Sequence, residues 1–394
     1  MVNTKDNWRN VNILEVCTIQ VGKTPSRDNN SYWGAGYPWL SIRDMNGKRV
    51  FTHTKESITQ KAVDECRCKI VPVNTVIYSF KLSIGKVGIT GIPMYTNEAI
   101  AAFLIKDLSV LDTNYLAYVL EATDFSGDSN KAVMGKTLNK RLLGEFEIPL
   151  PELSEQKEIV RELDRVNLLI QKRKESINLL DEYLKSVFLE MFGSPLDLNN
   201  NTERVEMSDL GKIVTGNTPS RLDPSNFGSY IEWIKSDNLN NNEYYLTKAT
   251  EYLSEKGSKI GRIVPAGSVL VTCIAGSLDC IGNAGIADRP VSFNQQINAI
   301  VPNKRILTEF LYYQILVGKK LFHDASNNSM KGMLNKSNFS KIRMILPPMD
   351  LQYKFKEVFK SVVDLKKKNE MQLLDLENLN SSLMQEIFSK ESNG

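Results

Sequence analysis

The chain has 394 residues, 42% hydrophobic and 24% charged, which is the composition of an ordinary globular protein. Its net charge of +3 is too small to indicate a polyanionic partner, and it excludes none because local patches carry that signal. No apolar run approaches the roughly 18 residues that cross a bilayer, and residues 1–9 lack the apolar core of a signal peptide. The odd number of scattered cysteines, five, favours reduced thiols and a cytoplasmic location.

The most informative pattern is a repeat that spans half the chain. Gly22-Lys-Thr-Pro-Ser-Arg27 returns as Gly216-Asn-Thr-Pro-Ser-Arg221, at an offset of 216 − 22 = 194. Later matches keep the same order, as when Gly85-Lys-Val-Gly88 returns at an offset of 197 as Gly282-Asn-Ala-Gly285. Solenoid units recur every 20–50 residues, so an offset this long predicts a duplicated domain.

We expect the first domain at 1–150 and the second at 194–347, both of the α+β class. In the first domain, apolar runs punctuated by Gly, Pro and Asn predict strands at 75–80, 86–90 and 99–105. A helix is predicted at 114–122, with its counterpart at 309–317.

Two long helices are predicted, at 151–193 and at 348–394. Residues 154–191 contain no Gly or Pro, and their apolar residues follow a heptad pattern that is typical of a coiled coil. Ser154 and Asp350 are the expected N-caps, and Gly193 with Pro195 ends the first helix. Helices of equal length most simply pack as an antiparallel pair about 55–60 Å long, a fixed spacer between the two domains. Polar seam residues are expected to fix the register: Arg173, Lys366, Asn369 and Asn380.

No catalytic, cofactor-binding or metal-binding residue is predicted. Gly22-Lys23-Thr24 resembles the end of a phosphate-binding loop, but Cys17 occupies the position of the first glycine. The repeat replaces Lys23 by Asn217, so both copies keep a turn and an arginine instead of a nucleotide site. Signatures of amino-methyltransferases, dinucleotide-binding folds and serine hydrolases are missing from the sequence, and Cys66-x-Cys68 has no second cysteine pair for zinc.

The remaining chemistry is polar, lies in loops and occurs in both halves. Such side chains bind base edges and phosphates, although ordinary solvated turns have the same composition. Trp39 and Trp233 are expected to be core anchors. The candidate DNA-binding residues are Lys23, Thr24, Ser26, Arg27, Arg43, Lys81, Lys86, Lys136, Lys140, Thr218, Ser220, Arg221, Lys235, Asn238, Asn240, Asn283, Lys331 and Lys336.

In the order of these motifs the chain resembles the DNA-specificity subunits of Type I restriction–modification systems. The resemblance covers the whole chain. It rests on the Gly-x-Thr-Pro-Ser opening with a Trp about 17 residues on, the Gly-x-x-Gly before an Asn-led strand, and the duplicated heptad helices. A further element is the Ile148-Pro-Leu-Pro-x-x-x-x-Gln156 entry to the first helix, which is degenerate in the second copy except for Gln352.

The resemblance implies two target-recognition domains, each reading one half of a split DNA target, held apart by the two helices. It also implies that the helices dock two modification subunits, which bind S-adenosylmethionine and methylate adenine, and that restriction subunits complete the complex. Gln156 and Gln352 are expected at the partner interface. The chain itself would bind double-stranded DNA, hold no cofactor and have no catalytic activity.

Two alternatives remain: an enzyme with its own methyltransferase or nuclease activity, and a coiled-coil scaffold that binds no nucleic acid. Because the second domain has extra residues between Gly267 and Gly282, the two half-sites should differ.

Overall fold

The computed structural model describes residues 8–81, 83–123, 138–197, 202–239, 243–326 and 333–388. By their internal contacts the residues form two compact units. Unit 1 comprises residues 1–172 and 373–394, and unit 2 comprises residues 173–372. Each of the two long helices, α5 (Leu153–Phe192) and α11 (Met349–Phe388), therefore contributes one segment to each unit.

Unit 1 is built on one main sheet with strand order β2-β9-β6-β7-β4 and a smaller sheet with order β5-β3-β8. Helix α3 packs on β6 and β7, while β1 and β10 form a separate antiparallel pair. The elements are β1 (Arg9–Asn12), α1 (Ile13–Val16), β2 (Cys17–Val21), β3 (Trp33–Leu40), β4 (Val50–Phe51), β5 (Glu56–Ile58), α2 (Gln60–Cys66), β6 (Val76–Ser79), β7 (Val87–Thr90), β8 (Tyr95–Thr96), β9 (Ile100–Ile105), α3 (Thr113–Ala122), α4 (Lys140–Gly144) and β10 (Glu147–Leu150).

Unit 2 repeats this plan with the sheets β12-β19-β16-β17 and β14-β13-β18-β15 and the pair β11-β20. Its elements are β11 (Arg204–Glu206), α6 (Met207–Leu210), β12 (Gly211–Thr215), β13 (Phe227–Ile234), β14 (Tyr252–Leu253), α7 (Glu255–Ile260), β15 (Ile263–Val264), β16 (Val269–Thr272), β17 (Ala284–Ile286), β18 (Val291–Phe293), β19 (Ile297–Pro302), α8 (Thr308–Val317), α9 (Lys319–Ala325), α10 (Lys336–Ser340) and β20 (Arg343–Ile345). The duplicated α+β architecture expected from the sequence is confirmed.

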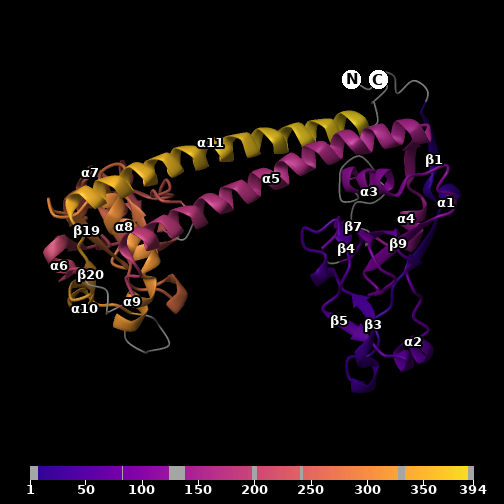
Figure 1. Ribbon diagram of the computed structural model, residues 1–394, viewed down its shortest axis with the longest axis horizontal. Coiled ribbons are helices and arrows are strands. Elements are labelled where there is room, and N and C mark those ends of the chain that lie inside the picture. Colours follow the sequence, from indigo (N-terminus) through magenta and orange to yellow (C-terminus); the bar gives the residue numbers. More distant parts are fainter. Residues whose placement is uncertain are drawn as a thin grey trace. The chain divides into compact units, whose positions relative to one another are not determined.

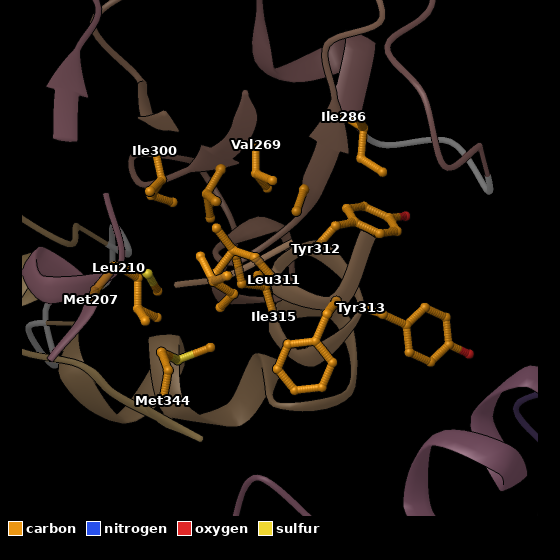
Figure 2. Packing of buried hydrophobic residues seen from close by; sticks show 14 of the residues in the cluster. Met207, Leu210, Val269, Ile286, Ile300, Leu311, Tyr312, Tyr313, Ile315 and Met344 are labelled. Carbon is orange, nitrogen blue, oxygen red and sulfur yellow. The ribbon is translucent and has the colours of Figure 1, made fainter. Parts of the chain in front are cut away.

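Each unit has one buried cluster between its main sheet and helix α3 or α8, and a second between the main sheet and the smaller sheet. Central strands such as β6 and β16 are buried on both faces, which explains why they are continuous apolar runs. In unit 2, Leu311 and Ile315 of α8 pack toward Val269 and Ile300 of the sheet (Figure 2). This packing makes the sheet a rigid support for the loops at its edges.

Within each unit, the segment of α11 packs antiparallel against the segment of α5 (Figure 1). Ile387, near the end of α11, joins the cluster of Ile159 and Leu163 in unit 1. Phe355, near the start of α11, contacts Phe188, near the end of α5, in unit 2 with ring centroids 5.4 Å apart. The expected antiparallel pairing is therefore confirmed.

The buried face of α5 differs in detail from the predicted seam. Phe188 and Phe192 are buried in the core of unit 2, whereas Val187 and Met191, the residues predicted for the seam, are only partly buried. This end of α5 packs on α8 as well as on α11, so its buried face is wider than a two-helix seam. The expected N-caps were also misplaced, since α5 begins at Leu153 and α11 at Met349, one residue before Ser154 and Asp350.

The polar seam residues of unit 2 bond to one another across the helix pair. Arg173 donates to Asn369 Oδ1 at 2.8 Å, and Asn369 donates to Ser176 Oγ at 3.2 Å. Arg173 and Asn369 are repeat equivalents (369 − 173 = 196), so the two helices contact each other at the same position of the repeat. Such a bond can form in only one register of the two helices. It therefore fixes the register, as predicted for polar seam residues.

Candidate nucleic-acid interface

The Gly-x-Thr-Pro-Ser-Arg turn joins the two sheets of each unit. In unit 1, Gly22 N donates to Ile100 O at 3.1 Å, and the indole of Trp39 donates to Lys23 O at 3.1 Å. In unit 2 the equivalent bonds are Gly216 N to Ile297 O at 3.0 Å and the Trp233 indole to Asn217 O at 3.3 Å. Both tryptophans are buried, so their predicted role as core anchors is confirmed.

Each turn requires its glycine because the neighbouring backbone leaves no room for a side chain. A Cβ on Gly22 would lie 2.2 Å from Asn97 O, and one on Gly216 would lie 2.0 Å from Asn294 O. The glycine and the backbone bonds of the motif thus form a structural junction. Lys23, Ser26 and Ser220 are exposed, whereas the Asn217 side chain donates to Ile260 O and accepts from Arg262 N.

The arginine that ends each turn is held in a fixed pose by a carboxylate and an aromatic ring. Arg27 lies 3.8 Å above the ring of Trp33 and pairs with both oxygens of Glu56, with Nη2 to Oε2 at 2.9 Å. The hydrogen bond from Arg27 lowers the pKa of Glu56 below its usual 4.5 despite partial burial. Half of the Arg27 side chain remains exposed, so part of a preorganised guanidinium faces solvent.

Unit 2 has an equivalent arginine–carboxylate cluster, to which a lysine is added. Arg221 donates to Glu251 Oε2 at 2.7 Å, and Lys235 bonds the other oxygen of the same carboxylate. The hydrogen bonds from Lys235 and Arg221 lower the pKa of Glu251 below 4.5. The position equivalent to Lys235 in unit 1 is Ser41 (235 − 194 = 41), which is uncharged. The two units therefore present different arrays of charge at one common place.

The threonines of the turns also differ in their partners. Thr24 bonds the carboxylate of Glu98, whereas Thr218 bonds the side-chain amide oxygen of Gln295. These two acceptors are repeat equivalents (295 − 98 = 197), so the same contact carries a negative charge in unit 1 only.

A short 3-10 turn follows each buried Trp, at Ile42–Asp44 and at Ser236–Leu239. Arg43 is exposed on the first of these turns. Asn238 is instead buried, because its side chain accepts from Lys235 N and donates to Thr247 Oγ1 and Lys248 O. Those bonds use the side chain to stabilise the turn, so we assign Asn238 to the fold.

Other predicted contacts lie apart from the arginine clusters or are engaged within the fold. Lys86 donates to Ile42 O at 3.3 Å and to Asn46 Oδ1 at 3.1 Å, and Asn283 accepts from Lys319. Lys81 lies 5.4 Å from the ring of Phe80. Lys140 and Lys336 are exposed at the first positions of α4 and α10. Figure 1 shows α4 well separated from β3, β5 and α2, which lie at the end of unit 1 away from α5. Lys136, Asn240 and Lys331 lie outside the described residues.

Gln156 and Gln352 are not partner-binding side chains, which corrects the expectation from sequence. Both are fully buried. Gln156 accepts from Asp112 N at 2.9 Å and donates to Val110 O and Pro151 O, and Gln352 makes the equivalent three bonds to Leu307, Arg305 and Pro347. Each glutamine binds the start of a long helix to the loop before α3 or α8. A subunit that docks on the surface of the chain therefore cannot contact the glutamine side chain.

Sequence reasoning missed the carboxylates that hold the arginines. Glu56 and Glu251 are repeat equivalents (251 − 56 = 195), and this match was the one available signal. The aromatic supports Trp33 and Phe227 also share the offset of 194, although their residue types differ.

The two halves of the chain each match the model of one known family. The family model for the Type I restriction modification DNA specificity domain matches residues 5–179 and again residues 199–376. The chain belongs to this family. The two matches agree with the duplicated architecture, and each extends into a long helix.

Relatives of the chain carry the same description. It is 30% identical over 194 residues to the specificity subunit of the Type I restriction enzyme HindI of Haemophilus influenzae, covering 48% of this chain and 41% of that protein. It is 28% identical over 251 residues to the MjaIX specificity subunit of Methanocaldococcus jannaschii, covering 62% and 56%. The matched regions thus span about half the length of these relatives.

Solved structures share the fold across the full length of the chain. A chain from a structural study of the assembly and conformational transition of a type I R-M system aligns with a TM-score of 0.62 at 16% identity, covering 98% of both chains. The S subunit from M. genitalium aligns with a TM-score of 0.55 at 13% identity, covering 100% and 99%. Among the described residues, no helix is both apolar enough and long enough to cross a membrane.

Proposed function

We propose that the chain recognises a bipartite, asymmetric sequence in double-stranded DNA as the specificity subunit of a Type I restriction–modification complex. The observation that carries this proposal is the duplicated arginine cluster, Arg27 with Glu56 and Arg221 with Glu251. An arginine held by a carboxylate and an aromatic ring loses little side-chain entropy on binding, and its planar donors suit a guanine edge or a phosphate.

The differences between the clusters support an asymmetric target. Lys235 adds a positive charge in unit 2, while Glu98 replaces the neutral Gln295 in unit 1. The connection between the central hairpin strands is also longer in unit 2, running from 273 to 283 against 80 to 86 in unit 1. Two surfaces that differ in charge and loop length should read different bases.

The long helices are the proposed docking surface for two modification subunits. In unit 2 their outer faces form a shallow groove lined by apolar residues, among them Leu180, Tyr183, Val358 and Leu365. Exposed apolar surface of this kind is typical of a protein contact. S-adenosylmethionine and the methylation of adenine would belong to those partner subunits, and restriction subunits would complete the complex in the cytoplasm. The chain itself would have no catalytic role.

Exchanging the first domain tests the proposal. Residues 1–150 are replaced by the corresponding domain of another family member, and the chimera is expressed with its modification subunits. Because each unit carries its own cluster, we expect one half of the methylated motif to change and the other to remain. Single-molecule methylation profiling of the host DNA reads both halves. An unchanged motif, or the loss of both halves while the complex still assembles, would contradict separate readers.

A further inference from the structure

After the 3-10 turn that follows the buried Trp, both units return to the main sheet at equivalent residues. In unit 1, Arg49 O accepts from Ile89 N at 2.7 Å, and in unit 2 Tyr244 O accepts from Ile286 N at 3.0 Å. The next residues pair in parallel with the same isoleucines, Val50 with Ile89 and Tyr245 with Ile286. Positions 49 and 244 are therefore equivalent in the fold although their side chains are chemically unrelated.

In unit 1 the side chain at this position reaches toward α5 through a tyrosine. The Arg49 guanidinium lies 3.7 Å above the ring of Tyr118 on α3 and pairs with Glu121 at 3.1 Å. The hydroxyl of Tyr118 donates to Asp164 Oδ1 at 2.6 Å and accepts from Asn167 Nδ2 at 3.0 Å. Asp164 and Asn167 both belong to α5.

In unit 2 the side chain reaches α5 directly. The hydroxyl of Tyr244 donates to Asp181 Oδ1 on α5. The buried ammonium of Lys366 on α11 binds both oxygens of Asp181, at 2.8 and 3.0 Å, and lies 4.8 Å from the Tyr244 ring. The ring also contacts Phe359 of α11, with centroids 5.2 Å apart.

The other end of each link is bonded to the turn beside the arginine cluster. In unit 2, Asn238 binds Thr247 and Lys248, and Arg289 donates to Leu246 O and Thr247 O, so the turn and the segment after Tyr244 are joined. In unit 1, Lys86 donates to Ile42 O and Asn46 Oδ1, and Asn46 donates to Arg43 O at 2.8 Å. Lys86 directly precedes β7, whose Ile89 N donates to Arg49 O, so β7 joins the turn to position 49. Each turn is thus connected through position 49 or 244 to the long helix of its own unit.

We infer that Arg49 and Tyr244 are positioning residues, each of which fixes the DNA-facing turn of its unit to α5. The inference rests on the proposed function, since it assigns the turns to DNA recognition. Each link lies wholly within one unit and uses different groups, so the pose of one turn can change while the other stays fixed. Target specificity would then depend on residues at the helices as well as on residues that touch bases.

The test uses the full-length chain with Tyr244→Phe, Arg49→Gln and Tyr118→Phe. Tyr118→Phe keeps a ring beneath Arg49 but removes the hydroxyl that binds Asp164. Amide hydrogen exchange is followed at residues 41–45 and 235–239. We expect Tyr244→Phe to speed exchange in the second turn roughly tenfold, as the loss of one hydrogen bond to a charged group implies, and to leave the first turn unchanged. The two unit 1 variants should show the reverse. Tyr313→Phe, which changes a neighbouring buried tyrosine of α8, serves as the control.

A functional measurement separates positioning from plain stability. In the assembled complex, methylation rates are compared on duplexes with single base changes in either half of the target. We expect Tyr244→Phe to reduce the penalty for changes in one half and to retain it in the other.

If hydrogen exchange in the variants is unchanged, or is faster by the same factor in both turns, Arg49 and Tyr244 are not positioning residues. Sequence-specific methylation by the wild-type complex would in that case still support the proposed function. If the wild-type complex discriminates no DNA sequence, the proposed function fails and the positioning role fails with it.

Discussion

At the scale of single residues, the Gly-x-Thr-Pro-Ser-Arg turn contains residues that build the same structure in both units and residues that differ between the units. Gly22 and Trp39 and their equivalents build the junction between sheets. Lys23 against Asn217, and Ser41 against Lys235, change the surface that the junction presents. The repeat therefore separates residues that make the turn from residues that give it chemistry.

The role of Arg27 is tested by Arg27→Gln in the assembled complex. Losing a base or phosphate contact worth about 1–3 kcal/mol should lower methylation at a limiting DNA concentration roughly tenfold or more. The ion pair with Glu56 is exposed, so we expect little change in stability. Arg141→Gln removes a more exposed arginine–glutamate ion pair on α4 and is the control. Equal methylation by both variants would exclude Arg27 from the DNA interface.

The need for glycine in the turn is tested by Gly216→Ala. The added Cβ would meet backbone oxygen atoms that cannot move independently, so we expect unfolding to become easier by about 3 kcal/mol or more. Gly276→Ala, where the Cβ would meet nothing within 4 Å, should change stability by less than about 0.5 kcal/mol. Denaturant midpoints of the full chain measure both, and similar midpoints would refute the close-approach argument.

At the scale of elements, α5 and α11 are joined by a polar set that a heptad pattern only partly reveals. Arg173, Lys366 and Asn369 interrupt the apolar seam, and each has a partner across the helix pair. Asp181, which binds Lys366, is not a seam residue. Its role depends on Tyr244 and on Lys366 of α11, which are distant in sequence and bind it in the folded chain.

The pair Lys366–Asp181 should respond unequally to the loss of either partner. The Lys366 side chain is 8% exposed and that of Asp181 is 42% exposed. Asp181→Asn therefore leaves a buried charge unpaired and should cost about 3–5 kcal/mol. Lys366→Met leaves a carboxylate that water can reach and should cost less than about 1 kcal/mol. Urea unfolding measures the loss of stability in each variant. A larger loss for Lys366→Met than for Asp181→Asn would show that burial of the charged group does not determine the cost of losing its partner.

At the scale of the whole molecule, duplication supplies two similar units, and two continuous helices contribute a segment to each. The boundaries between the two units lie within these helices, at 172/173 in α5 and at 372/373 in α11. Residues added at these two places should leave the contacts inside each unit intact.

A matched insertion tests the helices as a spacer. One heptad placed after Lys172 and another after Gln372 lengthens the pair by about 10 Å, or roughly three base pairs of DNA. We expect the unread spacer of the methylated motif to grow by that amount. A heptad inserted after Lys172 alone lengthens α5 but not α11, so the pairing of the two helices cannot be kept in both units, and this variant should impair assembly. Methylation profiling distinguishes the outcomes, and an unchanged spacer in the matched variant would contradict a measuring role.

The sequence by itself determined the duplication, the α+β class, the two long helices and the family, because repeats and apolar periodicity are local records of backbone structure. It also located the turns, since Gly22 and Trp39 recur at one offset. Tertiary structure alone decided how the polar residues are used. Gln156 and Asn238 are bonded inside the fold, Glu56 and Glu251 hold the arginines, and Asp181 binds Tyr244. Whether a polar side chain is buried or presented depends on neighbours distant in sequence, and no local pattern encodes those neighbours.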